Sequence, residues 1–196
     1  MTNRAEFLVE PVPYTSIRPK GARSATGPGD LELTLTYLAR RETRRIPALA
    51  LAAELKVPTA RNSLIGTGET DYTGYLIASK RFGRLDSHAN LGYTVVGVPT
   101  GTSLGNILNY ALAGEFELTP TTEIFGEVLG NTTAGAEAGD APGTGTVVVV
   151  PEASAGELVG TIGVARRISS AIRLSIGLSY DNSSALQVRP GITLWF

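Results

Sequence analysis

His88 is the side chain of this sequence best suited to acid–base chemistry, because imidazole commonly moves protons near neutral pH and the chain has one histidine. Ser87 precedes it and would be the nearest nucleophile. Adjacent residues of an extended strand point to opposite faces, so these two side chains would lie apart. No other set of nucleophile, base and acid stands out. We therefore expect no enzyme, and expect His88 to be hydrogen-bonded to its neighbours.

Metal and phosphate binding also lack the residues that they need. The chain has no cysteine and one histidine, which argues against a transition-metal site. The glycine-rich stretches GTSLGN, GTGET and GTGTVVVV lack the Lys-Ser/Thr pair of a phosphate loop. Glu137 and Asp140 are better explained as solvated loop charges than as calcium ligands. We expect no metal and no cofactor.

Charge and hydropathy exclude further classes of protein. Lys and Arg number 17 and Asp and Glu 18, so a net charge of −1 predicts no nucleic-acid partner. The longest apolar run, counting Pro47, extends from Ile46 to Ala53, well short of the roughly 20 residues of a transmembrane helix. The start, MTNRAEFLVE, lacks the basic and apolar regions of a secretory signal. An exported protein needs such a signal, so an outer-membrane location requires that this sequence be a mature form.

Apolar and polar residues alternate along most of the chain with the two-residue period of β-strands. The clearest segments are 31–42, 47–57, 85–96, 108–118, 172–180 and 186–196, and less regular ones are 6–14, 72–82, 123–131 and 158–166. They exceed the usual soluble strand of about 5 to 6 residues and approach the about 9 to 11 residues that cross a membrane. We expect about ten strands in a single domain over residues 1–196.

The connections between these segments alternate in length. Long ones fall at 17–30, 59–70, 97–105 and 130–156, tight ones at 40–45, 81–85, 118–122 and 166–171, and 181–185 is short where a long one could stand. Outer-membrane barrels alternate in this way, with long extracellular loops and short periplasmic turns. The pattern predicts an all-β, transmembrane, antiparallel up-and-down β-barrel of about ten strands, with both termini at the short-turn end.

Alternation alone does not distinguish a membrane barrel from a soluble barrel or sandwich, which hides its apolar face instead of turning it to lipid. Three features favour the membrane. The polar faces are rich in small residues, which suits a narrow interior, and the last strand, GITLWF, runs to Phe196. Aromatic residues lie mostly near strand ends, where membrane interfaces place them: Tyr14, Tyr37, Tyr72, Tyr93, Phe116, Tyr180 and Phe196.

The polar side chains of a membrane barrel face inward. Candidates for lining the lumen are Glu54, Lys56, His88, Asn90, Glu115, Glu117, Arg173 and Arg189, and Glu32, Glu123 and Glu127 fall on the same face. Buried charges must pair or be hydrated, and about eight strands are just filled by side chains whereas 16 or more leave a channel. Two functions stay open. One is a passive channel for small solutes; the other is a non-conducting structural or binding barrel with a plugged lumen and the 130–156 loop as its contact surface.

A family resemblance is carried by AEFLVEPVPYT with GPGDLELTLTYLARRE, PALALAAELKVPT with DYTGYLIASKRFG, and RLDSHANLGYTVVG. Its more specific parts are Gly29-Asp30 before a strand and the run Asn90–Thr94. These stretches resemble the outer-membrane barrels described as "Putative MetA-pathway of phenol degradation". The resemblance implies a porin-like transporter in the bacterial outer membrane, surrounded by the lipid bilayer and with periplasmic termini. The link to phenol breakdown is one of genetic context and suggests aromatic or hydrophobic solutes. Members usually have a signal peptide and further N-terminal sequence, such as another hairpin, and whether ten strands close without it stays open.

Barrel closure requires the first and last strands to pair, because an open edge in lipid leaves backbone groups unsatisfied. Pro11 and Pro13 in the first segment donate no ladder hydrogen bond, and both fall on the same edge of the strand. We expect 31–42 to take the intact edge and 186–196, or a further hairpin, to face the other. Direct closure would place hydrogen bonds between about 6–10 and 187–195.

Phe196 resembles the terminal aromatic residue that barrel-assembly machinery recognises, which implies that machinery as a partner. Replacing Phe196 with Asp, or deleting it, should lower membrane insertion in cells more than the free energy of unfolding, because a terminal residue makes few native contacts. Membrane fractionation and urea unfolding of refolded protein measure the two effects. Equal membrane levels of mutant and natural protein would contradict a sorting role.

Overall fold

The computed structural model describes residues 4–18, 23–134 and 156–195, and its regular structure there is entirely β. The strands are β1 (Ala5–Pro11), β2 (Thr15–Ile17), β3 (Ala25–Gly27), β4 (Leu31–Arg40), β5 (Ala48–Val57), β6 (Asp71–Phe82), β7 (Leu85–Val95), β8 (Ile107–Thr119), β9 (Thr122–Asn131), β10 (Leu158–Arg167), β11 (Ile172–Asp181) and β12 (Leu186–Leu194). Within the described ranges no helix is long and apolar enough to cross a membrane.

The long strands form one 10-stranded antiparallel sheet in the order β1-β4-β5-β6-β7-β8-β9-β10-β11-β12. Each of them therefore neighbours the next long strand of the chain, and the predicted up-and-down order is confirmed. Every segment with the alternating pattern is a strand, with ends shifted by a few residues at most. The prediction missed β2 and β3, which pair with each other in and beside the predicted loop 17–30. They have 3 residues each, too few to display a period of two.

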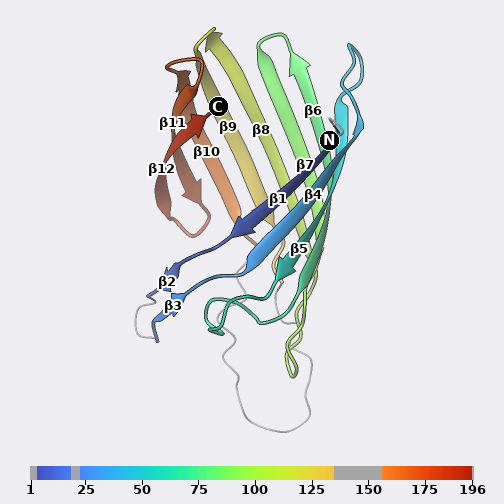
Figure 1. Ribbon diagram of the computed structural model, residues 1–196, viewed down its shortest axis with the longest axis vertical. Helices are drawn as coiled ribbons and strands as arrows, with labels where there is room; N and C mark the ends of the chain where they lie inside the picture. Colours follow the sequence, from blue (N-terminus) through green and yellow to red (C-terminus); the bar gives the residue numbers. More distant parts are fainter. Residues whose placement is uncertain (1–3, 19–22, 135–155, 196) are drawn as a thin grey trace.

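The sheet coils strongly, so that its two edge strands, β1 and β12, border the same opening (Figure 1). Both chain ends lie toward the end of the molecule that carries the short turns β6–β7 and β8–β9, at the top of the figure. The β2–β3 hairpin lies toward the opposite end, with the longer connections. The predicted long and short connections therefore lie at opposite ends of the sheet.

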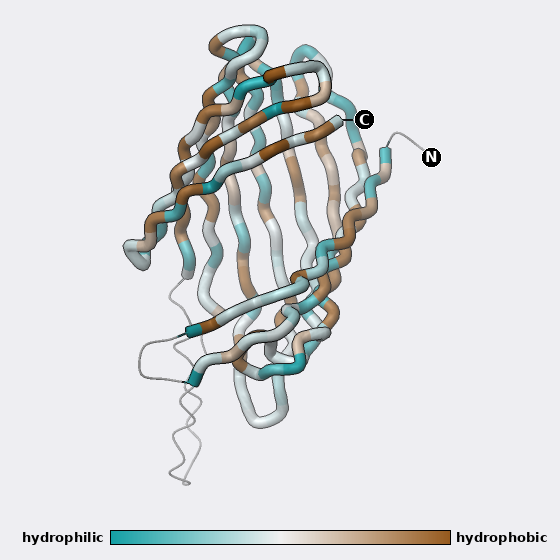
Figure 2. Tube along the Cα trace, turned by 60° about the vertical axis from the view of Figure 1, so that its left-hand side comes forward, coloured by the Kyte–Doolittle hydropathy of each residue, from teal (hydrophilic) through white to brown (hydrophobic). Residues whose placement is uncertain are grey.

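The polar side of the sheet is its inner side. Arg173 Nη2 on β11 lies 3.9 Å from Glu115 Oε1 on β8, although β9 and β10 separate the two strands. Neighbouring strands lie about 4.8 Å apart, so these side chains meet because they point into the curve. Figure 2 shows that hydrophobic and polar residues alternate along the strands. Successive side chains of a strand point to opposite sides of the sheet.

Apolar side chains cover the outer side and stay exposed. Leu35, Ile176 and Ile192 have 52%, 51% and 65% of their surface exposed. The buried hydrophobic residues of the described ranges are all small, and these are Ala25, Ala52 and Ala165. Large apolar side chains of the described residues therefore do not form a buried core.

Small polar groups take the buried positions on the inner side. The hydroxyl oxygens of Thr73 and Thr94 lie 2.9 Å apart across β6 and β7, and those of Thr161 and Ser179 lie 2.8 Å apart across β10 and β11. All of these side chains are buried. The hydrogen bonds satisfy groups that would otherwise be costly to bury.

The free edge of β1 carries a missing donor. The Leu38 N–H donates to the Arg4 carbonyl oxygen at 2.7 Å. In an antiparallel pair, residues whose backbone groups bond to the partner strand alternate with residues whose backbone groups point away from it. The backbone N–H and C=O groups of the even-numbered residues of β1 therefore point toward β4, and those of the odd-numbered residues point toward the free edge. Pro11 is odd-numbered and pairs with Leu31. The prediction that 31–42 takes the intact edge is confirmed.

The free edge of β12 has the same defect. The Trp195 N–H donates to the Ala171 carbonyl oxygen at 3.0 Å, so the backbone groups of the odd-numbered residues of β12 point toward β11. Pro190 is even-numbered, so its backbone nitrogen lies on the free edge. In the described part of the chain β1 and β12 have no ladder between them, so the predicted hydrogen bonds between 6–10 and 187–195 are absent. Both edges that would have to meet lack a donor.

Candidate functional site: the inner face of the sheet

The side chains predicted to line the interior all fall on the inner side of the sheet. The strand registers place them on five strands: Glu54 and Lys56 on β5, His88 and Asn90 on β7, Glu115 and Glu117 on β8, Arg173 on β11 and Arg189 on β12. That they line a conducting lumen stays a prediction.

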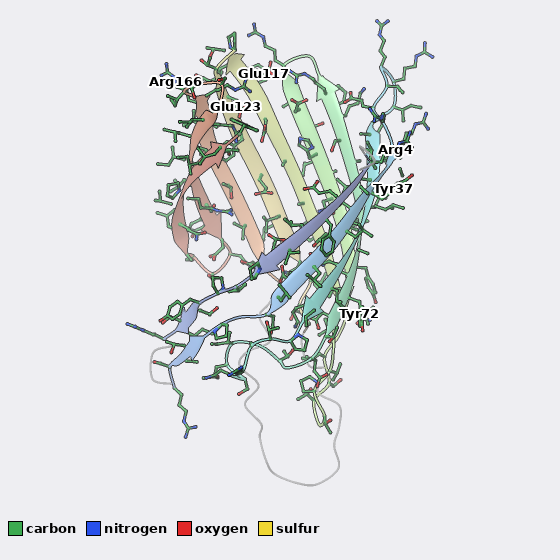
Figure 3. All side chains as sticks on the ribbon, in the orientation of Figure 1. Arg4, Tyr37, Tyr72, Glu117, Glu123 and Arg166 are labelled. Atoms are coloured by element: carbon green, nitrogen blue, oxygen red, sulfur yellow. The ribbon has the colours of Figure 1, made fainter. Side chains whose placement is uncertain are left out.

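One charge cluster joins three strands near the short-turn end. The Arg173 guanidinium contacts the Glu123 carboxylate, with Nε 2.6 Å from Oε1, and its Nη2 lies 3.9 Å from Glu115 Oε1. All three side chains are partly exposed. Glu117 and Glu123 both lie toward this end of the sheet (Figure 3). The cluster narrows the interior where β8, β9 and β11 begin or end.

A second cluster at the same end surrounds Arg81. Its guanidinium nitrogens lie 3.0 Å from Asp86 and 2.6 Å from Glu117. Since 46% of the Arg81 side chain and 44% of the Glu117 side chain are exposed, water screens this ion pair and it contributes little to stability. Arg81 was not among the predicted lining residues, because the sequence assigned it to a tight turn rather than to the end of β6.

The turn between β4 and β5 is tied to β6 by Glu42. Lys80 Nζ lies 2.8 Å from Glu42 Oε1, and the Arg81 backbone N–H donates to the same oxygen at 3.1 Å. The hydrogen bond from Lys80, followed by that from Arg81, lowers the pKa of the Glu42 carboxyl. The carboxylate therefore stays charged and keeps this turn in place over the ordinary pH range.

The opposite end carries a third cluster around Lys56. Its ammonium nitrogen lies 2.6 Å from Asp71 and 4.0 Å from Asp30. Asp30 also accepts a hydrogen bond from the Ala60 N–H at 2.9 Å. A side chain at Gly66 would come within 2.7 Å of the same carboxylate. The Gly-Asp pair that marks the family resemblance thus anchors the loop between β5 and β6.

His88 has the predicted hydrogen bond, but its partner is not the adjacent serine. His88 Nδ1 lies 2.8 Å from the Ser79 hydroxyl, directly across β6 and β7. Ser87 points to the other side, where its hydroxyl donates to the Lys80 carbonyl oxygen at 2.9 Å. No carboxylate of the described residues bonds to the imidazole. The pair lacks the third group that would orient a catalytic base.

Several inner carboxylates have no basic partner in the described part of the chain. Glu54 is bonded instead by the hydroxyls of Thr34 and Tyr75, at 3.5 and 3.4 Å. The other unpaired carboxylates of the inner side are Glu6, Glu10, Glu32 and Glu127, and the unpaired cation of β12 is Arg189. Unpaired charge inside a barrel must be hydrated.

Two aromatic rings lie over glycines on the inner side. An added side chain at Gly92 would meet the Tyr75 ring at 2.4 Å, and one at Gly163 would meet the Phe125 ring and the Ile176 carbonyl oxygen. Gly177 lies next to Phe125 on the following strand. The sequence suggested neither ring as an inner residue, because Phe125 interrupts the polar alternation of its strand.

A hollow of about 310 Å³ lies beside the Phe125 ring. Small side chains and the inner side of β12 complete it, and these are Thr161, Ser175, Gly177, Pro190 and Gly191. The charged groups Glu127 and Arg189 lie at its border. The hollow is therefore bounded by the Phe125 ring, by glycine backbone and by the edge strand β12.

In the residues 4–18, 23–134 and 156–195, no group of His, Cys, Asp and Glu is arranged to hold a metal ion. Phe196 and the acidic pair Glu137 and Asp140 lie outside the described residues.

The comparison with known families bears on these features. The family model described as "Putative MetA-pathway of phenol degradation" matches residues 4–149. The chain belongs to this family. The matched residues include β1 to β9 and the charge clusters around Arg81 and Lys56. Arg173, Arg189 and Pro190 lie beyond it. No curated protein matches the chain.

Replacing Gly163 with Val should lower the free energy of unfolding by about 1–3 kcal/mol, the usual cost of overpacking. The added group would overlap the Phe125 ring and a carbonyl oxygen that is 2.5 Å away. Urea unfolding followed by the fluorescence of Trp195, the single tryptophan, measures the change. Gly160→Val on the same strand is the control, because no atom lies within 4 Å of its added group. Equal losses in the two variants would show that the Phe125 contact is unimportant.

Proposed function

We propose that this protein is a bacterial outer-membrane β-barrel, closed by its edge strands β1 and β12, that acts as a passive channel for small solutes. The family description supports solutes that are aromatic or hydrophobic. Long connections would face the outside of the cell, and the short turns and both termini would face the periplasm. The barrel-assembly machinery would be its partner during insertion.

The observation that carries this proposal is the distribution of exposed residues. Large apolar side chains from every long strand are exposed on the outer side, among them Phe7, Leu76, Leu112, Ile162 and Val188, at 50–69%. In water such a surface would drive aggregation, whereas lipid solvates it. An apolar solvent would stabilise this arrangement of faces, which supports the proposed membrane location.

Aromatic residues on the outer side support the same assignment. Tyr72, Tyr93 and Tyr180 lie at the long-loop ends of their strands, and Tyr37 and Phe116 near the short-turn ends. Tyr37 and Tyr72 point away from the interior at different heights (Figure 3). Two such bands are typical of the two interfaces of a bilayer.

The interior favours a narrow water-filled path over a sealed plug. The unpaired carboxylates and Arg189 need water, and the hollow beside Phe125 is not filled by side chains. The ion pairs of Arg173 favour the second candidate, a non-conducting structural or binding barrel, because they join β11 to β8 and β9 on the inner side. The two candidates differ in whether ions can pass this cluster.

Planar-bilayer recording in potassium chloride tests the channel. We expect discrete conductance steps from the natural protein, and larger steps from Arg173→Ala, because the substitution removes the cross-strand ion pairs. Arg166→Ala is the matched control: it removes an exposed arginine of β10 at the same end, which forms no ion pair in the described chain. If neither the natural protein nor Arg173→Ala conducts, the non-conducting barrel replaces the channel.

Replacing Ile176 with Arg tests which side meets lipid. Ile176 lies in the middle of β11 on the outer side and is 51% exposed. An arginine at mid-membrane should cost about 2–4 kcal/mol of folding free energy. Unfolding from lipid vesicles measures this cost, and Ser175→Arg, on the inner side, should act through packing instead. A soluble monomer in which Ile176 is buried would contradict the membrane assignment.

A further inference from the structure

We propose that the seam between β1 and β12 is a lateral outlet, through which an uncharged aromatic solute passes from the interior hollow into the surrounding lipid. The inference rests on the proposed closure of the barrel. This lateral route would be additional to the axial channel and would carry a different class of solute.

The first argument is the position of the prolines. Within the long strands, proline occurs only at Pro11 of β1 and Pro190 of β12. Both lie on the edges that face away from the existing sheet, as derived above from the hydrogen bonds of Leu38 and Trp195. Prolines protect open edges from unwanted pairing in soluble proteins. A closed barrel has no edge to protect, so here they leave one joint weaker than the others.

The second argument is the position of the hollow. It lies on the inner side of β12, and Pro190 and Gly191 form part of its wall. The Phe125 ring and the Gly177 backbone form the opposite wall. Its volume of about 310 Å³ falls at the lower end of small-molecule sites, about 300–1,000 Å³. A small solute held there would touch the weakest joint of the barrel.

The third argument is what lies outside that joint. The outward-facing side chains of the two edges are apolar and more than half exposed in most cases: Phe7 is 63%, Val188 59% and Ile192 65% exposed. A molecule that left the hollow between the strands would enter an apolar surface directly. Ions would stay in the aqueous interior, because charge is costly in lipid. The outlet therefore selects uncharged solutes, and the ring of Phe125 suits flat aromatic ones.

Disulfides across the seam test the outlet. On closure, the even-numbered residues of β1 and the odd-numbered residues of β12 both face inward, so Thr193 lies opposite Glu6 or Leu8 in two neighbouring registers. These are pairs without ladder hydrogen bonds, whose Cα atoms lie about 4.5 Å apart, within the range of about 4.4–6.8 Å for a disulfide. Thr193→Cys is therefore combined with Glu6→Cys and, separately, with Leu8→Cys.

The control disulfide joins two strands that are already paired. Thr73→Cys with Thr94→Cys replaces two hydroxyls that lie 2.9 Å apart on the inner side of β6 and β7. Neither residue lines the hollow, and this disulfide leaves the seam free. Reduction of each disulfide provides an internal control for every variant.

Two readouts separate the outlet from the channel. Conductance in potassium chloride reports the axial path, and uptake of radiolabelled naphthalene by bacterial cells that produce the protein reports the lateral one. We expect the oxidised seam variant to keep its conductance and to lose naphthalene uptake to the level of cells without the protein, with recovery on reduction. The control disulfide should change neither readout.

A complementary variant restores the missing donors. Pro11→Val with Pro190→Val should raise the urea concentration at the midpoint of unfolding and lower naphthalene uptake, because the seam gains hydrogen bonds. The outlet is wrong if neither cysteine pair forms a disulfide, or if oxidation leaves naphthalene uptake unchanged. If the protein does not conduct but oxidation of the seam disulfide still abolishes naphthalene uptake, the channel is wrong and the outlet is supported.

Discussion

Backbone hydrogen bonding is the constraint on which this structure depends. A strand with one free edge leaves alternate N–H and C=O groups unpaired, and no water can replace the partner where lipid surrounds it. β4 to β11 each have two neighbours in the sheet, whereas β1 and β12 have one. The sheet coils so that these two edges border one opening (Figures 1 and 2), and in the proposed membrane barrel their pairing would meet that requirement. The prolines occupy edge positions where a missing donor disturbs none of the ladders already formed.

The positions of the long strands could be predicted from sequence because most residues of the outer side are apolar. The segment 172–180, for example, became Ile172–Asp181. The face of each candidate residue followed from the same alternation. Strands with inner apolar groups, such as the one containing Phe125, gave weaker patterns because both sides of the strand carry large side chains there.

The partners of the inner residues could not be predicted. Alternation says which side a residue faces but not which residue lies opposite, and that depends on register. His88 therefore bonds to Ser79 rather than to its neighbour in sequence. Irregularities such as the register shift between Glu117 and Thr119 displace the pairing that turn lengths alone would suggest. The contact of Arg173 with Glu123, 50 residues away, likewise depends on the coil of the sheet.

The simple order of the sheet has an evolutionary consequence. Each long strand pairs only with the long strands before and after it in the chain. A two-strand unit can therefore be duplicated or deleted without changing any remaining pair, because both the neighbours and the up-and-down alternation are preserved. Such events alter the circumference in steps and leave the chemistry of each wall intact. The diameter of the interior is thus a trait that gene rearrangement can change independently of the residues that line it.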